Sequence, residues 1–111
     1  MAMEVARVNA VTIVTIPRRL DTNNAPEIMA EFKTLLAAQP GNMVLDFAGT
    51  EYIASSGLRI LLQVTRDKMK TGGKVALAGI KPPVLKIFEI AGFTSIFTIC
   101  NSREDAIRIM V

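Results

Sequence analysis

The feature that most constrains the fold of this chain is an alternation of short β-branched runs with longer segments of helical periodicity. Runs rich in Val, Ile, Leu or Thr predict strands at residues 3–8, 11–16, 43–47, 74–80 and 95–100. Only Asn9 and Ala10 separate the first two runs, which are therefore predicted to form a hairpin. Each later strand is preceded by a helical segment, and strands that alternate with helices pair in parallel through right-handed crossovers.

The helical segments are marked by start and stop signals. They are predicted to begin after Asn24, at Ser55, at Pro82 and after Ser102. The first three are predicted to stop at Pro40 and Gly41, at Gly72 or Gly73, and at Gly92. Asn24 and Glu27 have the spacing of a capping box, and Ser102 is predicted to cap the last helix. The second helix is predicted to bury an apolar face made of Leu58, Leu61, Leu62, Thr65 and Met69.

These elements predict one α/β domain that spans residues 1–111. Its sheet is expected to be mostly parallel, with about five strands, an antiparallel strand at one edge and about four covering helices. Half of the residues are apolar, which is enough for a proper core. No apolar run approaches the roughly 20 residues that span a bilayer, and the N-terminus lacks the pattern of a signal peptide. We therefore expect a cytoplasmic protein with no membrane insertion.

The composition argues against several functions. The net charge is only +3, the basic residues are spread along the chain, and five Phe, one Tyr and no Trp offer no base-stacking surface, so no nucleic-acid partner is expected. The absence of histidine removes the commonest general base and the Ser-His-Asp arrangement. Cys100, the only cysteine, lies in an apolar stretch and is expected to be a small buried hydrophobe.

Metal and phosphate motifs are also missing from the sequence. One cysteine and scattered carboxylates do not make a zinc site, and the carboxylates lack calcium or magnesium spacing. The "TGGK" stretch at 71–74 follows a helix and precedes a strand, which is the wrong context for a P-loop. We therefore predict a protein that is not an enzyme and has no catalytic residues, metal or cofactor.

Ser55 and Ser56 stand at the predicted start of the second helix, just past the carboxyl end of the 43–47 strand. Binding sites gather at that edge of a parallel sheet. A serine there commonly caps the helix by accepting a hydrogen bond from a free amide, and one of the two is expected to do so. The other reading is that a hydroxyl at a helix N-terminus carries a phosphate, which the free amides and the helix dipole accommodate. On a docking surface, that charge would switch binding off.

The segment "YIASSGLRILL" resembles the Asp-Ser-[Ser/Thr]-Gly-Leu signature of the STAS domain family, the bacterial anti-sigma-factor antagonists. Three further blocks resemble the family in the same order: "RRLDTNNAPEI", "NMVLDFAGTEYI" and "AGIKPPVLKIFEIAGFTSIFTIC". The resemblance covers nearly the whole chain. It implies that Ser55 is phosphorylated by an anti-sigma factor that is itself a serine kinase.

In such a partner-switching regulator of transcription, the unphosphorylated antagonist binds the kinase and frees its sigma factor. The phosphorylated form lets go, and a PP2C-type phosphatase resets it. The resemblance also implies a set of partner-binding residues around the serine: Asp21, Ala54, Ser56, Gly57, Leu58 and Arg59. Asp21 precedes the first helix and is expected to lie near the phosphorylated loop.

Three positions depart from the family pattern. Ala54 replaces the signature aspartate, and Arg18 and Arg59 stand where antagonists usually have glycine. The arginines are either solvated surface residues or a change in the partner that the site prefers, since arginine pairs with phosphate and carboxylate.

Two alternatives remain open at this stage. One is a STAS module that binds partners without a phosphoswitch, as in signalling scaffolds and in lipid- or anion-transport subunits; Ala54 favours it. The other is a nucleotide site near Asp21.

Overall fold

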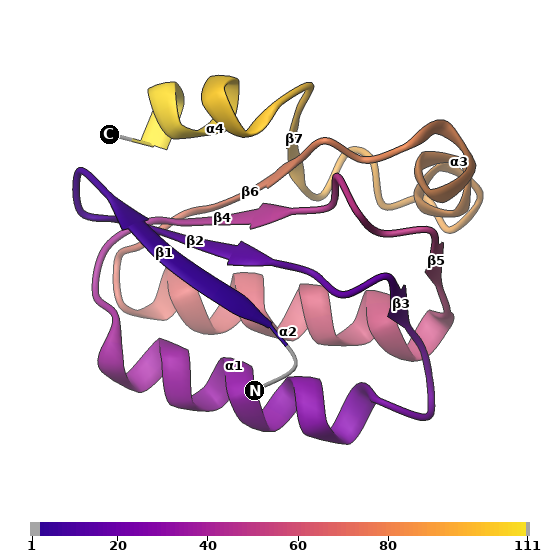
Figure 1. The fold of residues 1–111 in the computed structure, drawn as a ribbon, viewed down its shortest axis with the longest axis horizontal. Helices are drawn as coiled ribbons and strands as arrows, with labels where there is room; N and C mark the ends of the chain where they lie inside the picture. The colour runs from indigo at the N-terminus through magenta and orange to yellow at the C-terminus, as the bar shows by residue number, and fades with distance from the viewer. Residues whose placement is uncertain (1–2, 111) are drawn as a thin grey trace.

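The computed structural model describes residues 3–110 and contains four helices and seven strands in that range (Figure 1). The strands are β1 (Glu4–Val8), β2 (Val11–Thr15), β3 (Arg19–Leu20), β4 (Met43–Asp46), β5 (Tyr52–Ile53), β6 (Val75–Ala78) and β7 (Thr98–Cys100). The helices are α1 (Ala25–Ala38), α2 (Ser55–Lys70), α3 (Pro82–Ile90) and α4 (Arg103–Met110). The predicted helices and the five predicted strands are all present. Ser102 caps α4, as expected, by accepting a hydrogen bond from the Asp105 amide at 3.1 Å.

The main sheet has the strand order β1-β2-β4-β6-β7. β1 pairs antiparallel with β2 at one edge, and every other pair is parallel, as the alternation of strands and helices predicts. The hairpin turn consists of Asn9 and Ala10, which both have positive φ, at 50° and 70°. Two such residues in sequence match the right-handed twist of the strands that they join. Within the described residues, no helix is long and apolar enough to cross a membrane.

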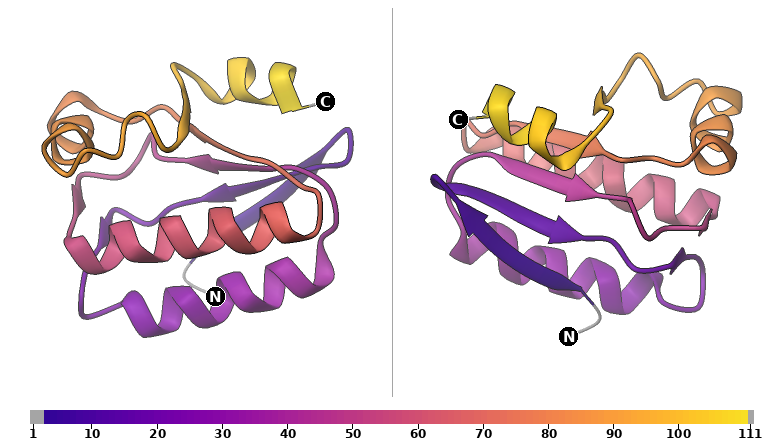
Figure 2. Two further views of the ribbon diagram at one scale, coloured as in Figure 1. Left: turned by 180° about the vertical axis from the view of Figure 1, so that it is seen from behind. Right: turned by 45° about the horizontal axis from the view of Figure 1, so that its top comes forward.

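The two faces of the sheet are covered unequally (Figures 1 and 2). α1 and α2 lie side by side on one face, α4 lies on the other, and α3 sits at the end of the molecule that β3 and β5 also occupy. The larger core lies on the α1 and α2 side and includes Phe32, Phe47 and Phe88. The smaller core lies beneath α4, where Ala76 and Ala78 of β6 let the helix approach closely.

Two strands were not expected from the sequence. β3 and β5 pair in parallel, Arg19 with Tyr52 and Leu20 with Ile53, and form a separate sheet beside the main one. Ser55 was predicted to lie just past the carboxyl end of the 43–47 strand, with no strand between them. Instead it follows β5, at the end of the segment that leaves β4. A two-residue strand is too short to show a periodicity, so the sequence pattern could not reveal it.

The prediction for the buried face of α2 was partly wrong. Met69 is 64% exposed, whereas Lys68 is 1% exposed. The Lys68 side chain runs inward, and its ammonium donates a hydrogen bond to the carbonyl oxygen of Gln39 at 2.6 Å, at the C-terminal end of α1. Burial lowers the pKa of Lys68, and the nearby charge of Arg7 lowers it further. The long side chain thus fills apolar space while its charged tip satisfies a helix end.

Candidate functional site

The loops that follow β3 and β5 meet at one end of the molecule. Because the two strands are parallel, their carboxyl ends place residues 21–24 beside residues 54–56. The Ala54 amide donates a hydrogen bond to the Leu20 carbonyl oxygen at 2.9 Å. The hydroxyl oxygens of Thr22 and Ser56 lie 3.4 Å apart and join the loops a second time. Segments more than thirty positions apart in the sequence therefore form one surface around the start of α2.

Neither serine caps α2, which corrects the capping prediction. The N-cap is Ala54, whose backbone is extended (φ −97°, ψ 171°) and whose carbonyl oxygen accepts hydrogen bonds from Gly57 and Leu58. Ser55 and Ser56 are the first two helical residues, so their side chains project from the helix surface. Ser55 is exposed and Ser56 is half-buried. Since side-chain capping needs the extended N-cap residue, the hydroxyl of Ser55 is left available.

Gly57 fixes the depth at which α2 packs against the loops. A Cβ atom at this position would lie 2.8 Å from side-chain atoms of both Leu20 and Ile53, and 2.9 Å from the Leu20 carbonyl oxygen. Such distances are well inside van der Waals contact, so only glycine fits here. Gly57 and the neighbouring Leu58 are both buried. They support the serine loop from inside and do not present side chains at the surface.

Asp21 organises the loop that faces the serines. Its carboxylate accepts hydrogen bonds from the amides of Asn23 at 3.0 Å and Asn24 at 3.4 Å, and from Arg19 Nε at 3.2 Å. The Arg19 bond holds the pKa of the Asp21 carboxyl below its usual value, and the two amides contribute in the same direction. Asp21 therefore stays ionised and keeps the loop in shape.

The capping-box prediction for α1 was wrong. Asn24 is the N-cap residue, but its backbone is helical (φ −107°, ψ −2°), and its side chain turns back to the preceding loop. Asn24 Nδ2 donates to the Arg19 carbonyl oxygen at 2.7 Å, and Asn24 Oδ1 accepts from the Asp21 amide at 3.0 Å. A side-chain cap requires an extended N-cap residue, which Asn24 is not.

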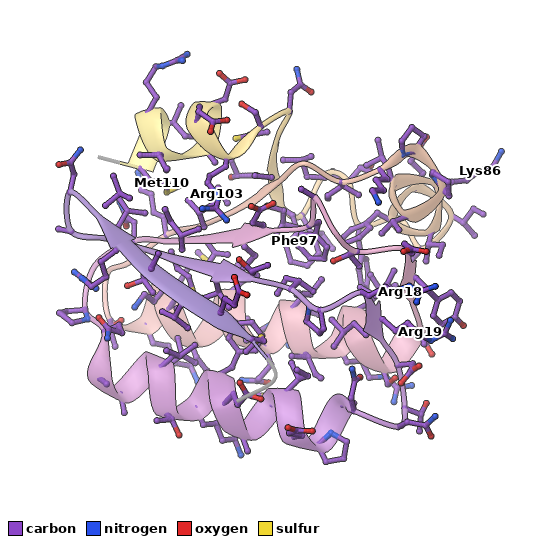
Figure 3. The ribbon with its side chains drawn as sticks, in the orientation of Figure 1. Arg18, Arg19, Lys86, Phe97, Arg103 and Met110 are labelled. Atoms are coloured by element: carbon purple, nitrogen blue, oxygen red, sulfur yellow. The ribbon has the colours of Figure 1, made fainter. Side chains whose placement is uncertain are left out.

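Three arginines surround this surface and differ in what they contact. Arg18 pairs with Glu51 at 2.9 Å, and Arg19 pairs with Asp21 while its guanidinium lies 4.6 Å from the centre of the Tyr52 ring. Figure 3 shows Arg18 and Arg19 at the end of the molecule formed by β3 and β5. Arg59 is exposed on α2, and within residues 3–110 its side chain has no hydrogen-bond or ion-pair partner. The surface is therefore basic, and one of its guanidinium groups is unengaged.

An open pocket of about 410 Å³ lies elsewhere, where β4, β6 and β7 end beneath α4. Asp46 and Arg103 line it and form an ion pair at 2.7 Å, and Figure 3 shows Arg103 below α4. Neither Asp21 nor Ser55 borders this pocket. Among the described residues, no three Asp, Glu, Cys or His side chains gather as metal ligands would.

Two features can be compared with known protein families: the strand order of the mixed sheet and the pair of serines at the start of α2. The family model of the STAS domain matches residues 2–106, and the chain belongs to this family. The family resemblance seen in the sequence is thus confirmed.

Particular relatives agree with this assignment. The chain is 33% identical over 106 residues to BtrV of Bordetella bronchiseptica, which is provisionally named an anti-sigma factor antagonist; the match covers 96% of this chain and 91% of BtrV. It is similar in structure to a STAS domain protein of Planctomyces limnophilus, with a TM-score of 0.88, 20% identity and 97% of each chain covered. It is also similar to phosphorylated SpoIIAA of Bacillus, with a TM-score of 0.75, 20% identity and coverage of 99% and 100%.

The structure brings most of the predicted site residues together. Asp21 and Ala54 lie in the two adjoining loops, Ser55 and Ser56 begin α2 beside them, and Arg59 follows one helical turn later. The sequence did not single out Thr22, Arg19 or Tyr52. Arg19 and Tyr52 come together because β3 pairs with β5. Strands of two residues have no periodicity, so the sequence carried no signal for this contact.

Proposed function

We propose that the protein is an anti-sigma-factor antagonist that works by partner switching, with Ser55 as the phosphorylated residue. The observation that carries the proposal is the position of Ser55: an exposed hydroxyl on the first residue of α2, beside a loop held by Asp21. The names of its sequence relatives support the same role. The unphosphorylated protein binds an anti-sigma factor with serine kinase activity, and a PP2C-type phosphatase restores that form.

The physical basis of the switch is local charge. A phosphate on Ser55 adds nearly two negative charges at neutral pH. The first turn of α2 contains no acidic residue, and its free amides and dipole favour an anion, so the fold tolerates the modification. A partner that has closed over the uncharged hydroxyl would instead have to bury the new charge. Phosphorylation therefore weakens binding without unfolding the domain.

The first experiment tests the modified residue. The protein is incubated with ATP and a kinase-type anti-sigma factor from the same genome, and phosphopeptides are mapped by mass spectrometry. We expect one phosphate on Ser55, lost in Ser55→Ala and retained in the matched variant Ser56→Ala. A phosphate that maps to Ser56 or elsewhere would contradict the assignment.

The second experiment tests the effect on binding. Ser55→Asp should bind the same anti-sigma factor at least about tenfold more weakly than wild type, which corresponds to about 1.4 kcal/mol. Ser55→Ala should bind about as tightly as wild type, because it removes no charge. Equal affinities for Ser55→Asp and wild type would contradict the switch.

A second candidate is a STAS interaction module that does not use a phosphate. Ala54 favours it, because alanine occupies the N-cap of α2, where the aspartate of the family signature could cap the helix and hold the loop. Under this reading wild type is not phosphorylated, whereas Ala54→Asp becomes a substrate. Efficient phosphorylation of wild-type Ser55 would exclude it.

A further inference from the structure

The strongest unassigned feature of the site is the pair formed by Ser55 and Arg59. They are four residues apart on α2, so they are neighbours on one helix face, with Cβ atoms about 5–6 Å apart. Both are exposed. Helical side chains point back toward the N-terminus of their helix, so the Arg59 guanidinium reaches over the turn that begins at Ser55.

Other charged groups do not compete for Arg59. Its helical neighbours at three and four positions on either side are Ser55, Ser56, Leu62 and Gln63, and none is a carboxylate. The two other arginines of the site differ in this respect. Arg18 is paired with Glu51 at 2.9 Å, and Arg19 with Asp21 at 3.2 Å, so a neighbouring carboxylate already offsets the charge of each, whereas Arg59 has no such neighbour on its helix.

We propose that Arg59 is an intramolecular phosphate clamp: when Ser55 carries a phosphate, the Arg59 guanidinium pairs with it. This inference rests on the proposed phosphorylation of Ser55 and deepens it. Arginine suits this role because its planar guanidinium presents several N–H donors to phosphate oxygens. The clamp adds a second component to the switch, because phosphorylation then also withdraws Arg59 from the surface that a partner would contact.

The clamp is tested on protein that carries phosphoserine at position 55 by genetic-code expansion, so no kinase is needed. The second phosphate ionisation is followed by ³¹P NMR as the pH is varied. Pairing with arginine favours the dianion, so the ionisation midpoint in the wild-type background should lie about half a pH unit below that in Arg59→Gln. Arg59→Lys, which keeps the charge, should recover part of the difference.

Arg66→Gln is the matched control. Arg66 is exposed on the same face of α2, seven residues beyond Arg59 and therefore about 10 Å further along the axis. This substitution removes the same charge but should leave the midpoint unchanged. The difference between wild type and Arg59→Gln should shrink in about 1 M salt, where exposed pairs are screened.

Equal midpoints for wild type and Arg59→Gln, or equal shifts for Arg59→Gln and Arg66→Gln, would overturn the clamp. The first result would mean that the two groups do not pair, and the second that only net charge is felt. Neither result bears on whether a kinase modifies Ser55, because the phosphate is installed directly. Conversely, a kinase that ignores Ser55 would end the proposed switch and leave the measured pairing intact.

Discussion

The two ends of the sheet are held together by different means. At the end that carries Ser55, backbone contacts bring the two segments together: β3 pairs with β5, the Ala54 amide bonds to Leu20, and α2 packs closely at Gly57. The Asp21 side chain shapes one loop, and Thr22 contacts Ser56. The polar side chains of Ser55 and Arg59 are left exposed there.

The opposite end, where the parallel strands begin, is held by polar side chains. Asn42 Nδ2 donates to the Met110 carbonyl oxygen at 2.7 Å, and Asn42 Oδ1 accepts from the Lys74 amide at 2.8 Å. The buried Lys68 ammonium bonds to Gln39 at the same end. Asn42 thus joins the starts of β4 and β6 to the end of α4, and Lys68 joins α2 to the end of α1 (Figure 1).

If the Ser55 end is the recognition surface proposed above, this contrast separates stability from recognition within one small domain. Where backbone contacts and a glycine fix the chain, hydroxyl and guanidinium groups remain free for a partner or a modification. At the other end, Asn42 and Lys68 use their polar side-chain groups to join separate elements. Substitutions at the two ends should therefore affect stability and partner binding in different proportions.

The largest expected effect is that of Gly57→Ala at the Ser55 end. Helix propensity alone would stabilise the variant by about 1 kcal/mol. The new Cβ, however, would meet Leu20 and Ile53 at 2.8 Å, and overpacking of this closeness costs about 3 kcal/mol or more. We therefore expect a net loss of about 2 kcal/mol in the free energy of unfolding, measured by urea denaturation, and weaker partner binding.

Gly49→Ala provides the control for this prediction. A Cβ at Gly49 would meet nothing within 4 Å, so the free energy of unfolding should change by less than about 0.5 kcal/mol. A Gly57→Ala variant that is more stable than wild type would show that helix propensity outweighs the packing and would contradict this account of the site.

Asn42→Ala should have the next largest effect, at the opposite end. It removes two hydrogen bonds that join separate elements, each worth about 1 kcal/mol net at most in this half-buried position. We expect a loss of about 1.5 kcal/mol by urea denaturation and unchanged affinity of the remaining folded protein for its anti-sigma factor. The exposed Asn23→Ala is the matched control and should change stability by less than about 0.5 kcal/mol. Weakened partner binding by folded Asn42→Ala would break the separation between the two ends.

Much of this fold follows from local pattern. The strands of the main sheet and all four helices have periodicities long enough to read, and Pro82, Gly72 and Gly92 mark their ends. β3 and β5 have two residues each and exist only because they pair with one another, so a local pattern cannot find them. The burial of Lys68 also depends on a distant contact. A lysine is ordinarily expected at the surface, and this one is buried because its ammonium bonds to the free carbonyl oxygen of Gln39 at the end of α1.

The site was predictable to a similar extent. The serines, Gly57 and Asp21 could be placed by a motif, because close packing and loop closure restrict which residues fit. The N-cap residue of α2 could not be predicted in this way, because whether it is Ala54 or Ser55 depends on where β5 ends. The ion pair of Arg18 with Glu51 and the stacking of Arg19 on Tyr52 join segments that are far apart in the sequence, so a local pattern could not find them.

The smallest expected effect concerns the pH dependence of the Ser55 end. The Arg19 hydrogen bond lowers the pKa of the Asp21 carboxyl in the folded protein. A carboxyl group whose pKa is lower in the folded than in the unfolded state stabilises the fold above its unfolded-state pKa, and this contribution is lost as the pH falls through the folded-state value. The loop after β3 should therefore loosen only in acid, below the ordinary range of aspartate, while the other end, held by neutral amides at Asn42, should not respond.

NMR titration of the side-chain carboxyl carbon of Asp21 measures this directly. We expect a midpoint below that of an unperturbed aspartate in wild type, and a higher midpoint in Arg19→Gln, which loses the first cause of the shift. Arg18→Gln is the matched control, because Arg18 pairs with Glu51 and should leave the Asp21 midpoint close to wild type. An unchanged midpoint in Arg19→Gln would mean that the amides of Asn23 and Asn24 alone hold the carboxylate. Arg19 would then have an exchangeable partner and would compete with Arg59 for a phosphate on Ser55.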